Sequence, residues 1–423
     1  MSLDLPPPSR REFLATLGLS ALSTALPTSV FAAEPVRGTM PADPSRDLAA
    51  NRANLGSLFP EVQKLAEANR YALSFSQGSF RTFAEFQSAA RAKLFDLLLY
   101  RPEPVDPRPE VLERVDCGDH IRERITFATT PRLRVPAYVL IPKKLKDRAP
   151  AIVDLHSHGG MFLFGKEKVI DFGDNHPAMT TYHQVNYDGR PTATELVRRG
   201  YVVITIDALM FGERRVIMDA DLKTGWDRAK YSLEDVTRLN AVCRAKESTL
   251  VKGLTFAGAT WPGVVFWDDM RTLDYLVTRP EVDPKRIGCV GISMGGYRSL
   301  FLTALDSRIR AGCVVGFMST VQPMIHANLE HSFVHFLPAL HRYLDWPDVV
   351  SLAAPRSLMV LQCSRDGLFP LAGMQDAVEK IASLYENAGA KEKFVGRFYD
   401  VPHKFTRPMQ EDAFAWFERQ LSA

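Results

Sequence analysis

The chain has 423 residues, which is enough for one large domain or two, and 46% of them are hydrophobic, an ordinary fraction for a globular protein. The formal net charge of +3 is close to neutral for this length. Basic residues are dispersed and do not gather beside aromatic residues, so the composition argues against a nucleic-acid partner.

The first 33 residues have the pattern of an export signal. Arg10 and Arg11 lie in Ser-Arg-Arg-Glu-Phe-Leu, which fits the twin-arginine pattern, and the apolar segment 14–26 is too short to span a bilayer as a mature helix. The segment 30–32 reads Val-Phe-Ala and supplies small residues that suit cleavage just before Ala33 or Glu34. The alternative is an amphipathic N-terminal helix. We expect the twin-arginine export machinery to carry the folded precursor, which places the mature protein in the periplasm or outside a bacterium.

Hydrophobic periodicity divides the rest of the chain into a helical part and an alternating β and α part. Residues 43–99 have a helical pattern that the proline-rich segment 101–109 ends, and two antiparallel strands are expected at 121–128 and 134–141. Further strands are expected at 151–155, 201–206, 286–292, 313–316, 357–362 and 394–399, and helices at 194–199, 264–278, 371–388 and 409–421. Continuous apolar strands separated by helices predict a mostly parallel sheet that is covered by helices on both faces.

This pattern gives a helical N-terminal extension at 43–109 and one α/β domain at 110–423. Two insertions, at about 214–261 and 319–350, should emerge at the carboxyl ends of strands and form a cap there. The second insertion has apolar residues spaced as in an amphipathic helix, namely Phe333, Phe336, Leu337 and Leu340. In such a helix most of the nearby histidines would serve packing. The mix of Phe, Leu, His and Trp, including His331 and His335, also suits the wall of a pocket.

Ser293 lies in Gly291-Ile292-Ser293-Met294-Gly295, directly after the apolar run 286–292 and before a helix-compatible segment. Gly-x-Ser-x-Gly between a strand and a helix is the context of a nucleophile elbow, in which a tight turn exposes the serine hydroxyl. Glycine is needed two residues before and after the serine because neighbouring backbone crowds both positions. The alternative is a glycine-rich helix start that Ser293 merely caps. We predict that Ser293 is a catalytic nucleophile.

An acid and a base follow Ser293 in the order that a Ser-Asp-His triad of this kind requires. Asp366 comes directly after the strand expected at 357–362, where its carboxylate could orient a histidine. Its alternative role is to form an Asp-Gly turn. His403 follows the last expected strand, and it is the only one of the ten histidines after Asp366. A solvated loop histidine is the alternative there, but an imidazole at that position can accept and return the serine proton.

An oxyanion hole needs two backbone N–H donors. The amide of Met294, at the start of the helix after the nucleophile, is the expected first donor. The second should come from the loop after strand 151–155, His156-Ser157-His158-Gly159-Gly160, where we favour the amide of His158. Asp207, at the end of strand 201–206, is expected to anchor a loop, with substrate contact as the alternative.

Histidine and cysteine patterns do not predict a metal site. The His156-x-His158 pair has no carboxylate or cysteine pattern beside it that would complete one. The five cysteines contain no Cys-x-x-Cys motif, and three of them lie in or beside expected strands, where a thiol usually acts as a small buried apolar group. We therefore expect neither a metal nor an organic cofactor.

Several stretches together resemble a bacterial branch of the α/β-hydrolase superfamily, near acetyl xylan esterases and dienelactone-hydrolase-like proteins. These stretches are 134–142, 156–160 with 165–168, 268–276, 279–283 before the elbow, and 353–358 ahead of Asp366. The resemblance covers about residue 110 to the C-terminus and implies the α/β-hydrolase fold, the Ser293-Asp366-His403 triad and ester hydrolysis. Ser157 stands where such proteins usually have a loop glycine.

The sequence thus predicts an exported serine hydrolase that cleaves carboxylic esters, such as acetyl or other acyl esters of carbohydrates. One alternative is a serine peptidase of the prolyl-oligopeptidase type, although no blade-length repeats of a β-propeller occur upstream. The other is a non-catalytic binding protein on a hydrolase fold. The acyl and alcohol parts of the substrate and the oligomeric state do not follow from the residues.

Overall fold

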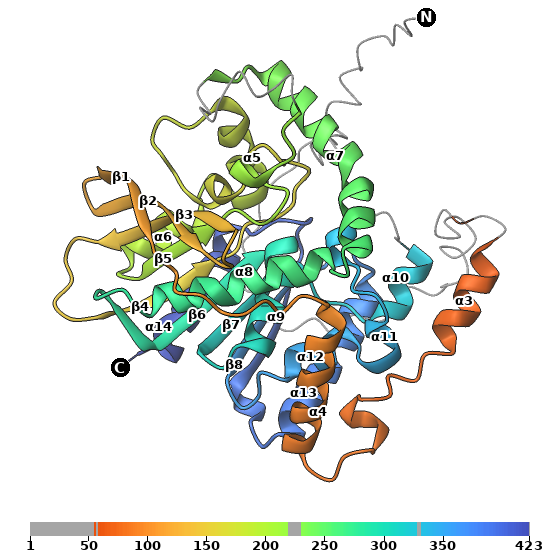
Figure 1. Ribbon diagram of the computed structural model, residues 1–423. Coiled ribbons are helices and arrows are strands. Elements are labelled where there is room, and N and C mark those ends of the chain that lie inside the picture. The colour runs from red at the N-terminus through yellow and green to blue at the C-terminus, as the bar shows by residue number, and fades with distance from the viewer. Residues whose placement is uncertain (1–54, 56–57, 219–229, 328–330, 423) are drawn as a thin grey trace, which may run out of the picture.

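The computed structural model describes residues 55, 58–218, 230–327 and 331–422. The expected signal at 1–33 and the beginning of the helical extension lie outside these ranges. The centre of the protein is a nine-stranded sheet in the order β1-β2-β3-β5-β4-β6-β7-β8-β9 (Figure 1). The strands are β1 (Glu110–Asp116), β2 (His120–Ala128), β3 (Arg134–Pro142), β4 (Ala149–Asp154), β5 (Val202–Ile206), β6 (Val282–Ile292), β7 (Ile309–Val315), β8 (Ser357–Cys363) and β9 (Phe394–Tyr399).

The sheet changes from antiparallel to parallel at β5. Strands β1, β2, β3 and β5 pair antiparallel, and every pair from β5 through β4 and β6 to β9 is parallel. The expected mostly parallel sheet is therefore confirmed. Parallel neighbours align their carboxyl ends at one edge, so the loops after β4, β6, β8 and β9 share that edge.

Helices cover both faces of the sheet. The α-helices are α3 (Phe59–Glu67), α4 (Phe83–Leu98), α5 (Pro177–Tyr187), α6 (Thr192–Arg198), α7 (Leu233–Phe256), α8 (Trp261–Leu276), α9 (Met294–Leu305), α10 (Val321–Ala327), α11 (Leu340–Tyr343), α12 (Trp346–Ser351), α13 (Leu371–Asn387) and α14 (Arg407–Gln420). Short 3-10 helices are η3 (Phe75–Gln77), η4 (Lys166–Val169), η5 (Gly212–Arg214), η8 (Phe333–His335) and η9 (Lys391–Lys393).

Two hydrophobic clusters lie on opposite faces of the sheet because strand side chains alternate between them. Ala151 and Val153 of β4 belong to one cluster, together with side chains of α4, α8, α9, α12 and α13. Ile152 belongs to the other cluster, with side chains of α5, α6 and α14. Strands that are buried on both sides read as continuous apolar runs, which is why their positions could be predicted.

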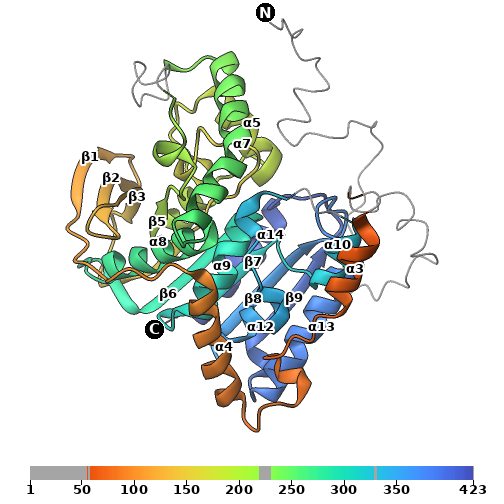
Figure 2. The ribbon, with the colours of Figure 1, turned by 45° about the vertical axis from the view of Figure 1, so that its right-hand side comes forward.

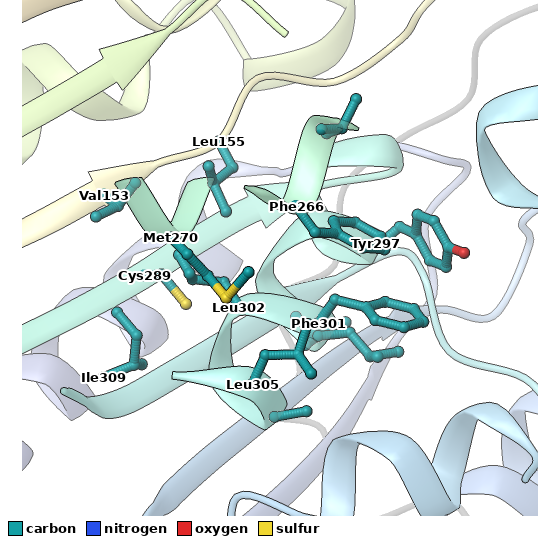
Figure 3. Close-up of a cluster of buried hydrophobic side chains, with 14 of the residues drawn as sticks. Val153, Leu155, Phe266, Met270, Cys289, Tyr297, Phe301, Leu302, Leu305 and Ile309 are labelled. Atoms are coloured by element: carbon teal, nitrogen blue, oxygen red, sulfur yellow. The ribbon is translucent and has the colours of Figure 1, made fainter. Parts of the chain in front are cut away.

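The helix that follows Ser293 is buried along its whole length. All twelve residues of α9 are buried, and its Phe301 ring stacks on Phe266 of α8 with centroids 4.2 Å apart (Figure 3). Arg298 of α9 makes two hydrogen bonds with Asp269 of α8, at 3.0 and 2.6 Å, and neither side chain is exposed. This buried pairing fixes α9, and with it the position of its first residue.

The N-terminal helices pack against the 319–350 insertion and its neighbours. Figure 2 shows α3 beside α10, where Gln322 Nε2 donates to the Ala66 carbonyl at 2.7 Å. Arg91 of α4 donates to the carbonyls of Ala304 and Leu352. The extension therefore shares its core with the α/β part of the chain.

The prediction of an amphipathic helix around 333–340 is wrong. The chain forms only η8 and then α11, with Pro338 between them, and proline removes a backbone donor and clashes with the preceding turn of a helix. Phe333 and Phe336 are each 44% exposed, so the apolar spacing does not mark one buried face.

Several elements of the described fold were not predicted, among them β1, α5 and the long helix α7 in the 214–261 insertion. Strand β1 reads Glu-Val-Leu-Glu-Arg-Val-Asp and is almost wholly exposed at the sheet edge, so it lacks an apolar face. Helix α5 begins at Pro177 with His176 as its N-cap and has a weak apolar stripe.

The five cysteines, all within the described ranges, carry free thiols, and Cys289, Cys313 and Cys363 are buried in β6, β7 and β8 as expected. Among the helices that the structure describes, none combines the length and apolar character needed to cross a membrane.

Candidate active site

Ser293 lies at the turn between β6 and α9. Its backbone has φ 61° and ψ −124°, a strained conformation for a residue with a side chain, and its N–H donates to the Val315 carbonyl at 2.9 Å. A Cβ at Gly295 would lie 1.9 Å from the Leu155 carbonyl oxygen, and one at Gly291 would lie 2.4 Å from the same atom. Both glycines are therefore required by close backbone contact, as the elbow motif predicts.

Asp366 and His403 come together from two loops at the same edge of the sheet. His403 Nδ1 and Asp366 Oδ2 are 2.6 Å apart, and the other carboxylate oxygen of Asp366 accepts from the Leu368 N–H at 2.8 Å. The Asp366 side chain is fully buried, so its carboxylate is directed at the imidazole rather than at solvent. His403 Nε2 is buried without a partner in the described structure, which leaves it free to accept a proton.

The imidazole of His403 lies against the elbow. Gly316, the residue after β7, has φ +54°, and a Cβ built there would be 3.4 Å from His403 Cε1 and 3.5 Å from Ile292 Cγ1. Gly316 thus lies close to both the His403 ring and Ile292, the residue that precedes Ser293. The structure brings all three predicted triad residues to one edge of the sheet, while their catalytic roles stay a prediction.

The loop after β4 lies against the same turn, because the Leu155 carbonyl contacts both elbow glycines. Lys168 Nζ donates to the carbonyls of Ser157, at 2.7 Å, and His158, at 2.9 Å. His156 Nε2 accepts from the Ala208 N–H at 3.1 Å, so its Nδ1 carries the proton and donates to the Ser157 carbonyl at 3.0 Å. The Ser157 carbonyl therefore accepts two hydrogen bonds.

These bonds fix the direction of the predicted oxyanion donor. In a trans peptide the C=O and the next N–H point in opposite directions, so the His158 N–H points away from Lys168. Burial lowers the pKa of Lys168 well below its ordinary value, since attraction to Asp207 and Glu167 offsets only part of the desolvation cost. The amide of Met294, at the first turn of α9, is the other predicted donor.

The imidazoles of His156 and His158 are committed to protein partners. His158 Nδ1 accepts from the Gly160 N–H at 3.0 Å, so Nε2 is the donor to Glu247 Oε1 at 2.9 Å. Both His156 nitrogens are also hydrogen-bonded. Each of the four ring nitrogens thus has a protein partner, and no His/Cys/Asp/Glu group suited to a metal ion occurs in the described part of the chain.

Asp207 anchors the loops behind the site. Its buried carboxylate accepts from the backbone N–H of Lys166 at 2.8 Å, from Lys166 Nζ at 2.6 Å and from the Glu213 N–H at 3.0 Å. Cβ atoms at Gly165 and Gly212 would each lie 2.2 Å from Asp207 Oδ1. The loop-anchor interpretation therefore holds.

A cavity of about 270 Å³ lies beside the triad. The 319–350 insertion supplies most of its wall, and Asn69 of the N-terminal extension also lines it. Phe369, another wall residue, stacks near the His403 ring with centroids 6.3 Å apart and an interplanar angle of 28°. The cavity and the predicted catalytic base thus share one aromatic side chain.

Sequence reasoning missed the burial of Lys168, which donates to the predicted oxyanion loop, and of its neighbours Lys166 and Glu167. Their Lys-Glu-Lys pattern predicts a solvated surface, because charged residues are rarely buried without partners. The pairing of Glu247 with His158 could not be predicted either, since Glu247 lies on α7, 89 residues away along the chain.

Comparison with known proteins agrees with this architecture. The chain is 28% identical over 307 residues to "Putative hydrolase YtaP" of Bacillus subtilis (strain 168), covering 71% of this chain and 89% of that protein. A crystal structure described as a "putative acetyl xylan esterase" from Bacteroides fragilis NCTC 9343 has a TM-score of 0.60 at 19% identity and covers 82% of this chain and 83% of its own. A glucuronoyl esterase from Solibacter usitatus has a TM-score of 0.53 at 15% identity, covering 78% and 92%.

At these identities the two solved structures establish a shared fold. The profile of the Abhydrolase family, in contrast, matches residues 56–413, which include the N-terminal helices, the elbow, Asp366 and His403. The chain therefore belongs to the Abhydrolase family of α/β hydrolases.

Proposed function

We propose that this protein is a serine hydrolase that cleaves carboxylic esters through an acyl-enzyme on Ser293. The Ser293 hydroxyl oxygen attacks the ester carbonyl while His403 Nε2 accepts its proton, and Asp366 stabilises the resulting imidazolium. The tetrahedral intermediate then collapses. The bond to the alcohol oxygen breaks, and His403 returns the proton to the departing alcohol.

Water completes the cycle. His403 accepts a proton from a water molecule that attacks the acyl-enzyme. The bond between Ser293 Oγ and the acyl carbon then breaks as His403 returns that proton to Oγ, which releases the carboxylic acid and restores the serine hydroxyl. In both steps the amides of Met294 and His158 hold the negative oxygen. The His403–Asp366 hydrogen bond at the edge of the Ser293 turn is the observation that carries this proposal.

Esters of carbohydrates are the substrate class that the relatives favour. The similar structures from B. fragilis and S. usitatus bear the names acetyl xylan esterase and glucuronoyl esterase, both of which describe esterases that act on sugar-containing molecules. The cavity next to His403 gives a substrate ring a place to bind. We propose acetyl or other acyl esters of a carbohydrate as substrates.

We also propose that the precursor is exported by the twin-arginine route. The Arg10-Arg11 pattern and the short apolar segment after it support this route.

Covalent labelling tests the mechanism. A fluorophosphonate should form one adduct, which mass spectrometry of the digested protein should locate on the peptide that contains Ser293. Ser293→Ala should abolish both labelling and ester turnover, whereas Ser299→Ala, a serine one and a half turns further along α9, should keep both. Adduct formation on another peptide, or full turnover by Ser293→Ala, would contradict the proposal.

A further inference from the structure

The cavity beside the triad is lined by residues that have no role in the proposed reaction. Phe317 directly follows Gly316, where an added Cβ would lie 3.4 Å from the His403 ring, and Phe369 stacks near that ring from the other loop. Most of the remaining wall comes from the 319–350 insertion, including His335 and Trp346, whose rings lie 5.0 and 5.1 Å from that of Phe317. A group bound here would therefore belong to the same substrate molecule as an ester placed at Ser293.

The wall of the cavity carries no charge. None of the described residues that line it is Lys, Arg, Asp or Glu. Burial lowers the pKa of His331 and His335, and it lowers that of His341 to about 4, so these imidazoles are neutral near pH 7. A carboxylate that entered the cavity would lose its water without gaining a counter-ion, which is strongly unfavourable. The cavity therefore suits an uncharged group.

Polar atoms in the wall nevertheless lack partners. Both ring nitrogens of His335 and the indole Nε1 of Trp346 are buried without a hydrogen bond in the described structure. The two residues are only 8% and 6% exposed. A neutral imidazole has one donor and one acceptor nitrogen, and an indole has one donor. Buried polar groups are normally satisfied, so these atoms favour a bound group that can both donate and accept.

A hydroxyl group meets that requirement because it is both a donor and an acceptor. The remaining wall is largely apolar and aromatic, as Phe317, Phe369 and Trp346 illustrate, and such surfaces accommodate the flat apolar face of a ring. We propose that the cavity binds an uncharged, hydroxyl-bearing ring of the ester substrate, held through His335 and Trp346. This inference rests on the proposed esterase function and adds the chemistry of the group beside the ester.

Binding of small probes to the Ser293→Ala protein tests the proposal without requiring turnover. Saturation-transfer NMR should compare methyl glucoside with methyl glucuronoside, which has the same ring and a carboxylate. Each hydroxylated probe also has a hydroxyl-free partner: methoxycyclohexane for the glucoside and ethylbenzene for 4-ethylphenol. We expect a neutral hydroxylated ring to bind at least about tenfold more tightly than its hydroxyl-free or anionic counterpart. The glucoside and phenol arms identify whether that ring is a sugar or a phenol.

Variants link the preference to the wall. His335→Phe keeps a ring but removes both nitrogens. We expect the affinities of the hydroxylated and hydroxyl-free probes to come within about twofold of each other in this variant, a loss typical of a removed hydrogen-bonding contact. His326→Phe, the same change in the same insertion at a residue outside the cavity wall, should leave the preference intact. If His335→Phe does not fold, Trp346→Phe makes the corresponding test.

Three results would overturn the proposal: equal binding of glucoside and glucuronoside, no binding of any probe, or an unchanged preference in folded His335→Phe. The glucoside and glucuronoside comparison needs no substitution in the cavity wall. Failure of the esterase mechanism is a separate result, because it would appear as missing phosphonate labelling of Ser293 while the Ser293→Ala protein still bound its ring.

Discussion

Lys168 Nζ donates a hydrogen bond to the carbonyl oxygen of Ser157 at 2.7 Å, and both residues are buried. The same amine holds the carbonyl of His158. Since the peptide between Ser157 and His158 is planar, this side chain sets where the His158 N–H points. A lysine that never touches substrate would thus position a donor for the reaction.

Replacing Lys168 by Met should lower kcat with little change in KM. Loss of one oxyanion donor costs about 10²- to 10³-fold in kcat, and loosening that donor should cost at least about tenfold. The specific readout is the rate ratio between an ester and its thionoester, whose sulfur accepts hydrogen bonds poorly. That ratio should fall in Lys168→Met.

The matched control is Lys166→Met, which removes a neighbouring buried lysine bonded to Asp207 and Glu213 instead of the oxyanion loop. It should lower Tm but leave the ester to thionoester ratio unchanged. An unchanged kcat and ratio in folded Lys168→Met would show that the lysine is only structural.

Substitutions at His331 or His335 should change the ranking of ester substrates without removing the nucleophile. One pocket contact is worth roughly 10–200-fold in discrimination. Loss of a triad member costs on the order of 10⁴-fold or more. We expect His331→Ala and His335→Ala to keep phosphonate labelling while His403→Ala loses it. If either alanine variant abolished labelling as completely as His403→Ala, the assignment of the base would be wrong.

Stability should depend on the ionisation of Asp154, the last residue of β4. Burial raises its pKa to about 7, although the Thr192 hydroxyl, which donates to it at 2.6 Å, acts in the opposite direction. The folded state therefore binds more protons than the unfolded state between pH 4 and 7, and the free energy of unfolding falls as pH rises through this window. Three pKa units correspond to about 4 kcal/mol as an upper bound.

Urea denaturation at pH 5 and pH 8 should show a smaller loss of stability in Asp154→Asn than in the parent protein. Asp283→Asn is the control. The Lys285 N–H and Arg286 lower the pKa of Asp283, so the ionisation of Asp283 raises the free energy of unfolding as pH rises, opposite to the effect of Asp154. Parallel pH profiles for Asp154→Asn and the parent would refute the role of Asp154.

Export should depend on the arginine pair. Replacing Arg10 and Arg11 by Lys should leave the protein in the cytoplasm with its leader uncut, as cell fractionation and N-terminal sequencing would reveal. Replacement of Lys143 and Lys144, which lie far from the leader along the sequence, should not affect export. Unchanged periplasmic activity of the Arg10/Arg11 variant would rule out the twin-arginine route.

The sheet and the predicted triad positions could be anticipated because both depend on local patterns. A strand buried on both faces is a continuous apolar run, and the loop after such a strand lies at a known edge of a parallel sheet. That reasoning placed Ser293 at the turn after β6, Asp366 after β8 and His403 after β9.

The rest depends on contacts between distant segments. Lys168 and Glu247 look like surface residues until their partners, Ser157 and His158, are known. Apolar spacing at 333–340 matches a helix, but Pro338 interrupts the segment, and Phe333 and Phe336 are each 44% exposed instead of buried along one face.

The hydrogen bond from Ser74 to Asp348 at 2.6 Å joins residues that are 274 positions apart. Beside it, the backbone of Ala72 and Leu73 donates to the carbonyls of Arg342 and Tyr343. Closing so long a loop is entropically costly and slow, so the wall of the cavity should be among the last parts of the molecule to become ordered during folding. A ring bound in the cavity should in turn slow amide hydrogen exchange at Leu73. Leu73 is synthesised long before its hydrogen-bond partner, Tyr343.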